Sequence, residues 1–420
     1  IDEIHAYRGV FGSNLANVLR RLLRLCDFYG SHPQFILCSA TIANPGELAG
    51  MLTGRDIAVI DQSGAPTGTK HVVFYNPPVI NQQLGIRKSA LSETRALAAR
   101  LLKNGIQSII FARSRIQVEV LTKALKELVA DPIGGSGRVR GYRGGYLPSE
   151  RRGIEQALRA GQVDAVVSTN ALELGIDIGA LDACIMCGYP GTIASTWQQS
   201  GRAGRRHGVS LTILVASSAA IDQYIITQPD YFFRQTPEHA LLNPDNLYIL
   251  LSHLKCSAYE LPFKAGERFG NALGVDSMLQ YLEEATILRR VGDVWHWSAE
   301  DCPASEISLR TAMTENFLIM DITDPAHVRM VGEMDRFTVP MLLHENAIYL
   351  HEGAQYQVEE LDFDTCKAFI RRVNVDYYTD ADLNVSLSLL DIEEQAPHAA
   401  HGEVKVTALV KIFKKMKFDT

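Results

Sequence analysis

Apolar runs of strand length alternate with helix-like amphipathic segments over the first 236 residues. The expected strands are residues 1–5, 35–38, 58–60, 72–75, 108–111, 163–168, 183–187 and 211–215. Apolar residues recur at helical spacing in residues 11–29, 45–52, 116–129, 149–160 and 193–204. The stretch 76–89, which contains Pro77, Pro78 and Gly85, is typical of a linker. This alternation predicts two α/β units with parallel, doubly wound sheets, whose chemistry belongs at the carboxyl ends of the strands.

The pattern changes from about residue 239. Two helical segments, 246–257 and 276–284, precede a small hairpin at 287–298, and this order fits a winged helix. Short β-rich runs follow from residue 305, at 317–322, 347–349, 356–359 and 368–375. We therefore expect α/β domains at 1–76 and 77–236, a winged-helix-like domain at 237–303 and a β-rich accessory domain at 304–420.

Composition narrows the class of protein. No apolar run of the 420 residues is long enough to cross a bilayer. The net charge of −7 excludes a uniformly basic nucleic-acid binder, so any such surface must be a local stripe. The seven cysteines are scattered and odd in number, which indicates a reducing compartment. Cys184 and Cys187 have metal-ligand spacing, but they lie on an expected buried strand without a second pair, so core thiols are favoured over zinc.

The run Asp2-Glu3-Ile4-His5 stands at the end of the first expected strand. An acidic pair at that place can hold Mg²⁺ through bound water and polarise the water that attacks a γ-phosphate. Four residues alone also fit a solvated turn.

Ser39-Ala40-Thr41 follows the expected strand at 35–38. Two hydroxyl groups at a strand end can relay between a nucleotide site and a neighbouring domain. The alternative is that they cap the helix that begins near Pro45.

Residues 166–177 form a strand that leads into a turn presenting Thr169 and Asn170. Gly175 allows close approach of the backbone to a ligand, and Asp177 can accept hydrogen bonds from a ribose or hold a neighbouring loop. The alternative is an ordinary strand-to-helix connection in which the threonine is a cap.

The run QQSGRAGRR at residues 198–206 places three arginines within five residues, among two glycines. Guanidinium groups match phosphate oxygens and supply positive charge to a phosphoryl-transfer transition state. A solvated basic helix end is a poor alternative, because two glycines in such a helix are costly.

The order and spacing of these four segments resemble the motor motifs of superfamily 2 helicases. Longer runs are similar to the DEAD/DEAH-box (DEIH) helicases of the MrfA/YprA and Hrq-type branch. These runs are IDEIHAYRGVFGSNLANVLRRLLR at 1–24, FILCSATIANP at 35–45, YPGTIASTWQQSGRAGRR at 189–206, AIYLHEGAQYQVEELD at 347–362 and VDYYTD at 375–380. The resemblance implies tandem RecA-like P-loop NTPase domains, the first one partial, followed by the winged helix and the β-rich domain.

The resemblance also implies roles for single residues. Asp2 would coordinate Mg²⁺ and Glu3 would activate water, while His5, Ser39 and Thr41 would couple hydrolysis to movement. The residues implied at the nucleotide are Gly175, Asp177, Gln198, Arg202 and Arg205, of which Arg205 is the expected arginine finger.

The implied activity is that of an ATP-dependent 3′→5′ DNA helicase or translocase in repair. It would use ATP and Mg²⁺, act on single-stranded DNA with a 3′ tail, and work in the bacterial cytoplasm at the nucleoid. The chain lacks a Gly-x-x-x-x-Gly-Lys-Ser/Thr loop, so we expect a fragment truncated at both ends that is inactive alone. The four-cysteine cluster of the bacterial members is also missing, so zinc is expected only in a C-terminal domain outside this chain.

A local basic stretch at residues 138–159 is the expected track for a nucleic-acid backbone. The candidate contacts are Arg113, Ser114, Arg143, Gly144, Thr169 and Asn170. The alternative for the arginines is a solvated helix face. Trp295 and Trp297 could stack on a base, but core packing is the favoured role.

Two other functions stay open at this point. One is a helicase on RNA or hybrids, as in Lhr-like relatives. The other is a non-catalytic module that only binds nucleic acid or a partner.

Overall fold

The computed structural model describes residues 1–420 except 63, 65–67, 130–137, 175–177, 179–180, 205–207, 310–315 and 418–420. The chain forms two compact units. The first comprises Ile1–Pro66, Pro190–Gln198 and Thr227–Thr314, and the second comprises Thr67–Tyr189, Gln199–Ile226 and Glu315–Thr420. Among the described residues, no helix has both the length and the apolarity needed to cross a membrane.

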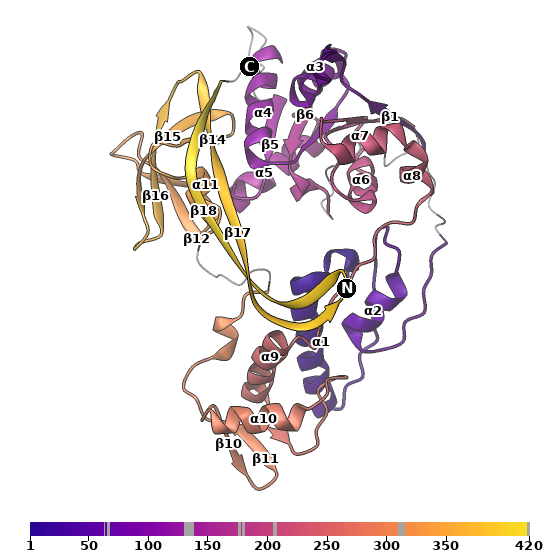
Figure 1. The fold of residues 1–420 in the computed structure, drawn as a ribbon, viewed down its shortest axis with the longest axis vertical. Coiled ribbons are helices and arrows are strands. Elements are labelled where there is room, and N and C mark those ends of the chain that lie inside the picture. Colours follow the sequence, from indigo (N-terminus) through magenta and orange to yellow (C-terminus); the bar gives the residue numbers. More distant parts are fainter. Residues whose placement is uncertain are drawn as a thin grey trace. The chain divides into compact units, whose positions relative to one another are not determined.

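The first unit begins with a short 3-10 helix, η1 (Ile4–Ala6), and two α-helices, α1 (Gly9–Phe28) and α2 (Pro45–Thr53) (Figure 1). Both α-helices match the predicted segments. Pro45 suits the first turn of α2 because its missing N–H would have no partner there, and Gly54, with φ 69°, ends the helix. Ile4, Leu19 and Leu48 pack together in the core of this part.

The strands predicted at 1–5, 35–38 and 58–60 were wrong. Ile4 N donates to Cys38 O (2.9 Å) and Cys38 N donates to Ile1 O (2.9 Å), but the bonds do not continue into a ladder. Ile36 and Ile60 are 74% and 93% exposed. Ile1 N also donates to Ile36 O (2.7 Å), so residues 1–4 lie alongside residues 36–38. An apolar run becomes a strand only where pairing continues over several residues, and none of these segments belongs to a sheet among the described residues.

The winged helix was predicted correctly. Helices α9 (Leu247–Glu260) and α10 (Val275–Glu284) pack on a sheet of order β10-β11-β9, formed by Leu288–Val291, Val294–Trp297 and Phe263–Lys264. Trp295 is 3% exposed, and its indole N–H donates to Glu283 (3.1 Å). The favoured core role of this tryptophan is therefore confirmed. Two shorter segments of the first unit are α8 (Pro229–Arg234) and η4 (Pro303–Glu306).

The second unit contains a six-stranded, wholly parallel sheet of order β1-β8-β7-β4-β6-β5. In sequence order the strands are Thr69–Tyr75 (β1), Ser108–Ala112 (β4), Val139–Tyr142 (β5), Ala165–Ser168 (β6), Ala183–Cys187 (β7) and Val209–Val215 (β8). The helices of the second unit are α3 (Ala90–Lys103), α4 (Arg115–Val129), α5 (Pro148–Arg159) and α7 (Ala220–Thr227), whereas residues 193–198 of α6 (Ile193–Ser200) belong to the first unit. Every residue of β4, β6 and β7 is buried, as continuous apolar runs in a parallel sheet predict.

Three details of this sheet differ from the expectations. β1 precedes the expected boundary at residue 76, yet it pairs with β8 from Thr69 to Tyr75. The expected linker contains a hairpin of β2 (Val79–Asn81) and β3 (Ile86–Arg87). Helix α6 ends at Ser200, before Gly201, rather than at residue 204. The four domain ranges themselves stay a prediction.

The β-rich region, also in the second unit, forms a five-stranded sheet of order β13-β12-β16-β15-β14. Its elements are β12 (Asn316–Asp321), β13 (Arg329–Asp335), α11 (Val339–Leu342), β14 (Ile348–His351), β15 (Ala354–Asp362) and β16 (Lys367–Val373). Phe317, Ile319 and Ile370 are among its fully buried core residues.

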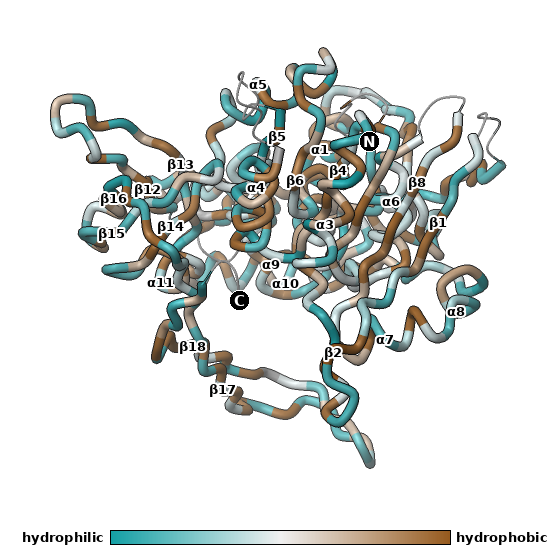
Figure 2. Tube along the Cα trace, turned by 90° about the horizontal axis from the view of Figure 1, so that it is seen from above, coloured by the Kyte–Doolittle hydropathy of each residue, from teal (hydrophilic) through white to brown (hydrophobic). Residues whose placement is uncertain are grey.

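A long hairpin, β17 (Tyr377–Ala396) with β18 (Ala399–Lys417), follows this sheet. Apolar and polar residues alternate along it (Figure 2). Residues paired across the two strands lie on the same face of the hairpin. Every second pair from Leu383–Val410 to Leu389–Val404 is apolar, so these alternate pairs make one face apolar.

Candidate nucleotide and nucleic-acid sites

The acidic pair lies in a tight turn at the start of the first unit. Glu3 adopts φ 53°, and its N–H donates to Oδ1 of the exposed Asp2 (2.9 Å). A left-handed conformation is unfavourable for glutamate, so the turn is locally strained. Carboxylate oxygens of this kind are donors that suit Mg²⁺.

His5 connects this turn to the Ser-Ala-Thr segment. The imidazole is 7% exposed, and its Nδ1 accepts a hydrogen bond from Ala40 N (3.1 Å). Glu3 Oε2 lies 3.4 Å from the same Nδ1. Because Nδ1 accepts the hydrogen from Ala40 N, the proton of the neutral imidazole lies on Nε2. Nδ1 then has no hydrogen to donate to Glu3, and the two groups are only close to each other.

Ser39 and Thr41 are exposed in the segment that His5 holds. Ser39 Oγ donates to Ala40 O (2.9 Å). Neither hydroxyl caps α2, since the N-cap residue of that helix is Asn44. The capping alternative for these two residues was therefore wrong.

Thr169 does act as a cap. Its Oγ1 accepts from Ala171 N (3.4 Å) at the start of a 3-10 turn, η3 (Asn170–Leu172), and Asn170 itself is exposed. This geometry agrees with the capping alternative, while a nucleic-acid contact of either residue stays a prediction. Gly175 and Asp177 lie outside the described residues.

The glycine- and arginine-rich segment holds the turn that follows Thr169. Arg202 is 5% exposed, and its Nε and Nη2 donate to Glu173 O, at 3.0 Å for Nε. Gln199 Nε2 donates to Glu173 Oε2 (3.0 Å). In this conformation the Arg202 guanidinium is bonded to a backbone carbonyl, and its role at a phosphate stays a prediction.

Gln198 on α6 differs from Gln199 in its hydrogen bonding. Its amide nitrogen is buried and hydrogen bonds to none of the described residues. A buried donor of this kind costs free energy unless a ligand or water accepts from it. That feature suits a residue expected to meet a nucleotide. Arg205 lies outside the described residues.

Arg113, a predicted nucleic-acid contact, is held by structural partners. Its guanidinium donates to Tyr189 O (3.0 and 2.7 Å) and to Asp222 Oδ1 (3.1 Å). Ser114 Oγ accepts from Gln117 N (3.2 Å) in the first turn of α4. A phosphate contact of Arg113 would therefore have to share a guanidinium that already has two partners.

Asp222 was missed by sequence reasoning. This carboxylate is 1% exposed and accepts from Ser217 N (2.8 Å) and Tyr189 N (3.3 Å) as well as from Arg113. It thereby joins the carboxyl ends of β7 and β8. No local pattern marks it, because two of its partners, Arg113 and Tyr189, are distant in sequence.

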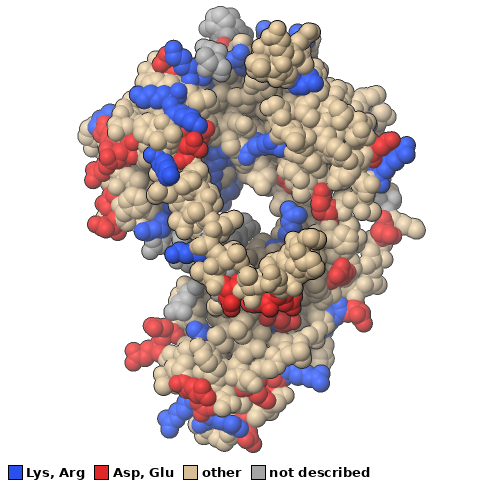
Figure 3. All heavy atoms as spheres, in the orientation of Figure 1, with Lys and Arg blue, Asp and Glu red and all other residues tan. Residues whose placement is uncertain are grey.

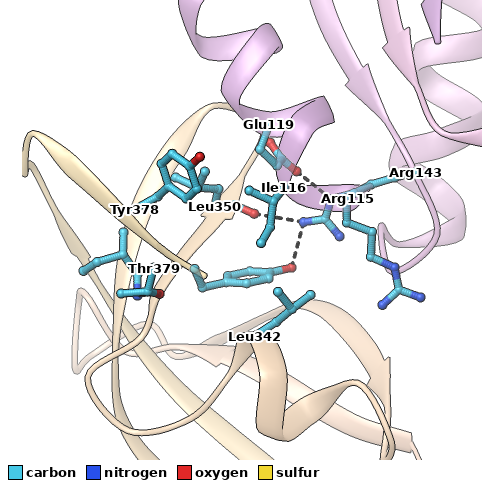
Figure 4. Close-up of a pocket in the computed structure, with 10 residues that line it drawn as sticks. Arg115, Ile116, Glu119, Arg143, Leu342, Leu350, Tyr378 and Thr379 are labelled. Carbon is cyan, nitrogen blue, oxygen red and sulfur yellow. Dashed lines mark hydrogen bonds and ion pairs between the residues drawn. The ribbon is translucent and has the colours of Figure 1, made fainter. Parts of the chain in front are cut away.

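Arg143 is buried, and the structure removes it from the candidate phosphate contacts. It is 1% exposed, and it donates to Glu119 Oε1 (2.7 Å) and Leu350 O (2.9 Å) (Figure 4). Tyr349 lies on it as well, with its hydroxyl 3.1 Å from Nη2. Burial by itself lowers the pKa of Arg143, but Tyr349 and Glu119 outweigh that effect and hold the pKa above its ordinary value.

The rest of the basic stretch is partly neutralised. Arg138 pairs with Asp164 (2.5 Å) and Arg140 with Glu352 (3.1 Å). Gly144 is half-exposed, with open space where a side chain would be. Figure 3 shows acidic and basic side chains interspersed over the faces in view. This distribution speaks against a uniformly basic surface, and a local basic stripe stays a prediction.

The two cysteines with metal-like spacing lie on β7 inside the sheet. Cys184 is fully buried, and burial raises the pKa of its thiol to about 12. A metal ligand must be a thiolate, which this environment disfavours. No cluster of three or more His, Cys, Asp or Glu that could hold a metal occurs among the described residues.

Comparison with known proteins decides the family. Residues 92–207 match the helicase conserved C-terminal domain, and residues 242–312 match the winged helix domain of the ATP-dependent helicase HRQ1. The chain is 58% identical to an ATP-dependent helicase of Bacillus subtilis, YprA, over its whole length. The chain belongs to the MrfA/YprA/Hrq1 branch of superfamily 2 helicases.

Other members of this branch are also similar to the chain. HRQ1 of Saccharomyces cerevisiae is 34% identical over 99% of the chain. A crystal structure of helicase MrfA bound to DNA matches all of the chain at 57% identity with a TM-score of 0.92. A second, with DNA and AMPPNP, matches with a TM-score of 0.91. The chain covers 56% of YprA and 40% of HRQ1, so it spans about half the length of the curated relatives it matches.

Membership of the MrfA/YprA/Hrq1 branch confirms the predicted fold class. The parallel sheet corresponds to the second RecA-like domain, and the winged helix and β-rich domain follow it. The individual site residues are not tested by this membership. Their roles are taken up as proposals.

Proposed function

We propose that this chain is part of an ATP-dependent 3′→5′ DNA helicase or translocase that works in DNA repair. The observation that carries the proposal is the hydrogen bond from Ala40 N to His5 Nδ1. It ties the acidic turn of a nucleotide site to the Ser-Ala-Thr segment, as a motor that couples hydrolysis to movement requires. One solved MrfA structure is bound to DNA and a second is bound to DNA and AMPPNP, which supports a helicase that acts on DNA and uses ATP.

The residues present fit the metal side of an ATP site. Asp2 would hold Mg²⁺, Glu3 would orient and polarise the attacking water, and Arg202 and Arg205 would meet transition-state charge. Gly175, Asp177 and Gln198 would contact the nucleotide. A bound Mg²⁺ would neutralise charge on the phosphates. The sequence contains no phosphate-binding glycine–lysine loop, so these residues supply only part of the site.

The polynucleotide track is proposed to follow the carboxyl ends of the strands of the second unit. The candidates that keep exposed groups there are Ser114, Gly144 and Asn170, with Arg113 beside them. Backbone contacts of this type would be independent of sequence and sensitive to salt. The proposed DNA substrate and the similarity to a Bacillus subtilis protein support a location of the helicase at the bacterial nucleoid.

The decisive experiment uses the longer helicase polypeptide that contains this chain. We expect single-stranded DNA to stimulate its ATPase, and Glu3→Gln to lower kcat by about 100-fold or more, the usual effect of removing a general base. Duplexes with a 3′ or a 5′ tail would report polarity. Equal ATPase in wild type and Glu3→Gln would contradict the proposal.

A helicase on RNA or hybrids is the second candidate. The likeness behind it is to the Mycobacterium smegmatis helicase Lhr, whose structure covers 71% of the chain at 26% identity with a TM-score of 0.56, but that structure is bound to single-stranded DNA and AMP-PNP and so does not itself favour RNA. Stronger stimulation of the ATPase by RNA than by DNA would favour this candidate. A non-catalytic binding module would show no stimulated ATPase with either.

A further inference from the structure

The segment that leads into the winged helix is bonded to helix α6. Glu238 Oε1 accepts from Ile193 N (2.7 Å), and Oε2 accepts from Ala194 N (3.1 Å). These are the first two residues of α6. Free N–H groups and the helix dipole make a helix N-terminus favourable for a carboxylate, so Glu238 stabilises α6 in place.

The same segment is bonded to the turn that follows Ser39-Ala40-Thr41. Ala43 N donates to Glu238 O (3.3 Å). Asn44 Oδ1 accepts from Ala240 N (2.8 Å), and Asn44 Nδ2 donates to Ala240 O (3.1 Å). Asn44 and Ala240 are 8% and 1% exposed, so these bonds are shielded from water. All of these residues belong to the first unit.

Local capping does not explain Glu238. Thr192 Oγ1 already accepts from Ser195 N (3.0 Å), so a residue adjacent to α6 supplies an ordinary cap. Glu238 reaches the helix from 45 positions away in the chain. A single residue thus bonds α6 through its carboxylate and the 43–44 turn through its carbonyl.

We propose that Glu238 is a positioning residue that makes the Ser-Ala-Thr turn and helix α6 move together. Helix α6 carries Gln198 and leads directly to Arg202, so its position sets where these groups meet a nucleotide. The proposal rests on the proposed ATPase function. Asn44 is the second half of the same connection, because it fixes Ala240 to the turn.

The first experiment measures the contacts in the 420-residue chain itself by hydrogen exchange. In Glu238→Gln, the Ile193 and Ala194 amides should exchange roughly 5- to 10-fold faster, as expected for a lost cap, whereas the Ala43 amide keeps its backbone acceptor. Glu260→Gln is the matched control, since Glu260 pairs with Arg21 in the same unit and does not bond to α6. Unchanged exchange at the two α6 amides would overturn the proposal.

The second experiment measures ATPase in the longer polypeptide. Glu238→Gln should keep KM for ATP and DNA affinity within about twofold but lower DNA-stimulated kcat about tenfold, because catalytic groups are misplaced rather than removed. Asn44→Ala should give the same pattern. The double variant should lose little more than either single one, because the two residues form one connection.

Three outcomes would contradict the positioning role. These are an unchanged kcat, a rise in KM alone, or strictly additive losses in the double variant. A wild-type polypeptide without DNA-stimulated ATPase would instead refute the proposed function, while the exchange experiment would still test the Glu238 contacts.

Discussion

Arg143 illustrates how burial changes the meaning of a charged residue. Among glycines and other arginines it resembles a phosphate contact in the sequence. In the structure its guanidinium is enclosed by Glu119 of α4 and Tyr349 of β14. Paired burial of this kind specifies geometry, because removing one partner leaves the other charge without compensation.

Arg143→Ala should lower the free energy of unfolding by about 3–5 kcal/mol, because Glu119 would remain buried without its cation. Urea unfolding measures the loss. Arg152→Ala is the control, since Arg152 is exposed on α5 and should change stability by no more than about 0.5 kcal/mol. A loss in DNA affinity without a loss in stability would show that Arg143 contacts DNA after all.

His253 should make the stability of the first unit depend on pH. Its Nδ1 lies 3.3 Å from Arg21 Nη1 and its Nε2 lies 3.0 Å from Asn14 Oδ1. Arginine can only donate, so Nδ1 must accept, and the ring is neutral. Burial, followed by the charge of Arg21, lowers the pKa of His253 to about 4.

The unfolded chain should therefore bind more protons than the folded chain between pH 6.5 and about 4. The contribution of His253 to the free energy of unfolding is fully present above pH 6.5 and is lost as the pH falls toward 4. The whole loss is on the order of 3 kcal/mol. His253→Gln should flatten that part of the stability curve, measured by urea midpoints at each pH. His296→Gln is the control, because His296 is exposed, and the same flattening there would contradict the assignment.

At the scale of elements, most residues of the β17–β18 hairpin are exposed. Leu387 and Val406 face each other across it and are 70% and 60% exposed. A two-stranded ribbon has marginal stability in water, and a continuous exposed apolar face promotes association. The alternating pattern fixes which face is apolar, whereas burial of that face requires contacts that the hairpin itself cannot supply.

We expect Leu387→Ser with Val406→Thr to reduce concentration-dependent self-association of the 420-residue chain, because the pair interrupts the apolar face. Light scattering across a dilution series measures it. Exchanging the polar pair by Ser386→Thr with Thr407→Ser is the matched control on the opposite face, and should have no effect. Equal association in both double variants would place the contact elsewhere.

At the scale of the whole molecule, the proposed motor motifs are divided between the two units. The acidic turn and the Ser-Ala-Thr segment lie in the first unit, and Arg202 lies in the second. The sequence also lacks the loop that cradles β- and γ-phosphates in such motors.

The 420-residue chain alone should therefore show no ATPase above background, with or without single-stranded DNA. A phosphate-release assay measures this, with the longer polypeptide as the positive control. Hydrolysis by the chain that Glu3→Gln abolishes would contradict the expectation. DNA binding that weakens with rising salt should persist, because backbone contacts need no nucleotide.

The sequence alone was enough to identify most of the long helices, most of the second-unit strands, the winged helix and the family, whereas helix α3 and the β17–β18 hairpin were not expected. Helical periodicity, continuous apolar runs and motif order are local signals that need no knowledge of distant contacts. The missed strand β5 is only four residues long and contains Arg140 and Gly141, so it lacks an apolar run. The strands expected before residue 61 were wrong because an apolar run does not state whether a neighbour is there to pair with it.

The sequence by itself determined which residue types stand at the motor motifs and in which order. Only the tertiary structure decided which of them are available to a ligand. Arg143 is buried, Arg113 already donates to Asp222, and Thr169 caps a 3-10 turn. It alone showed that Glu238 joins α6 to the 43–44 turn. The physical reason is that hydrogen bonds and burial depend on groups brought together from distant parts of the chain, and no local pattern records those partners.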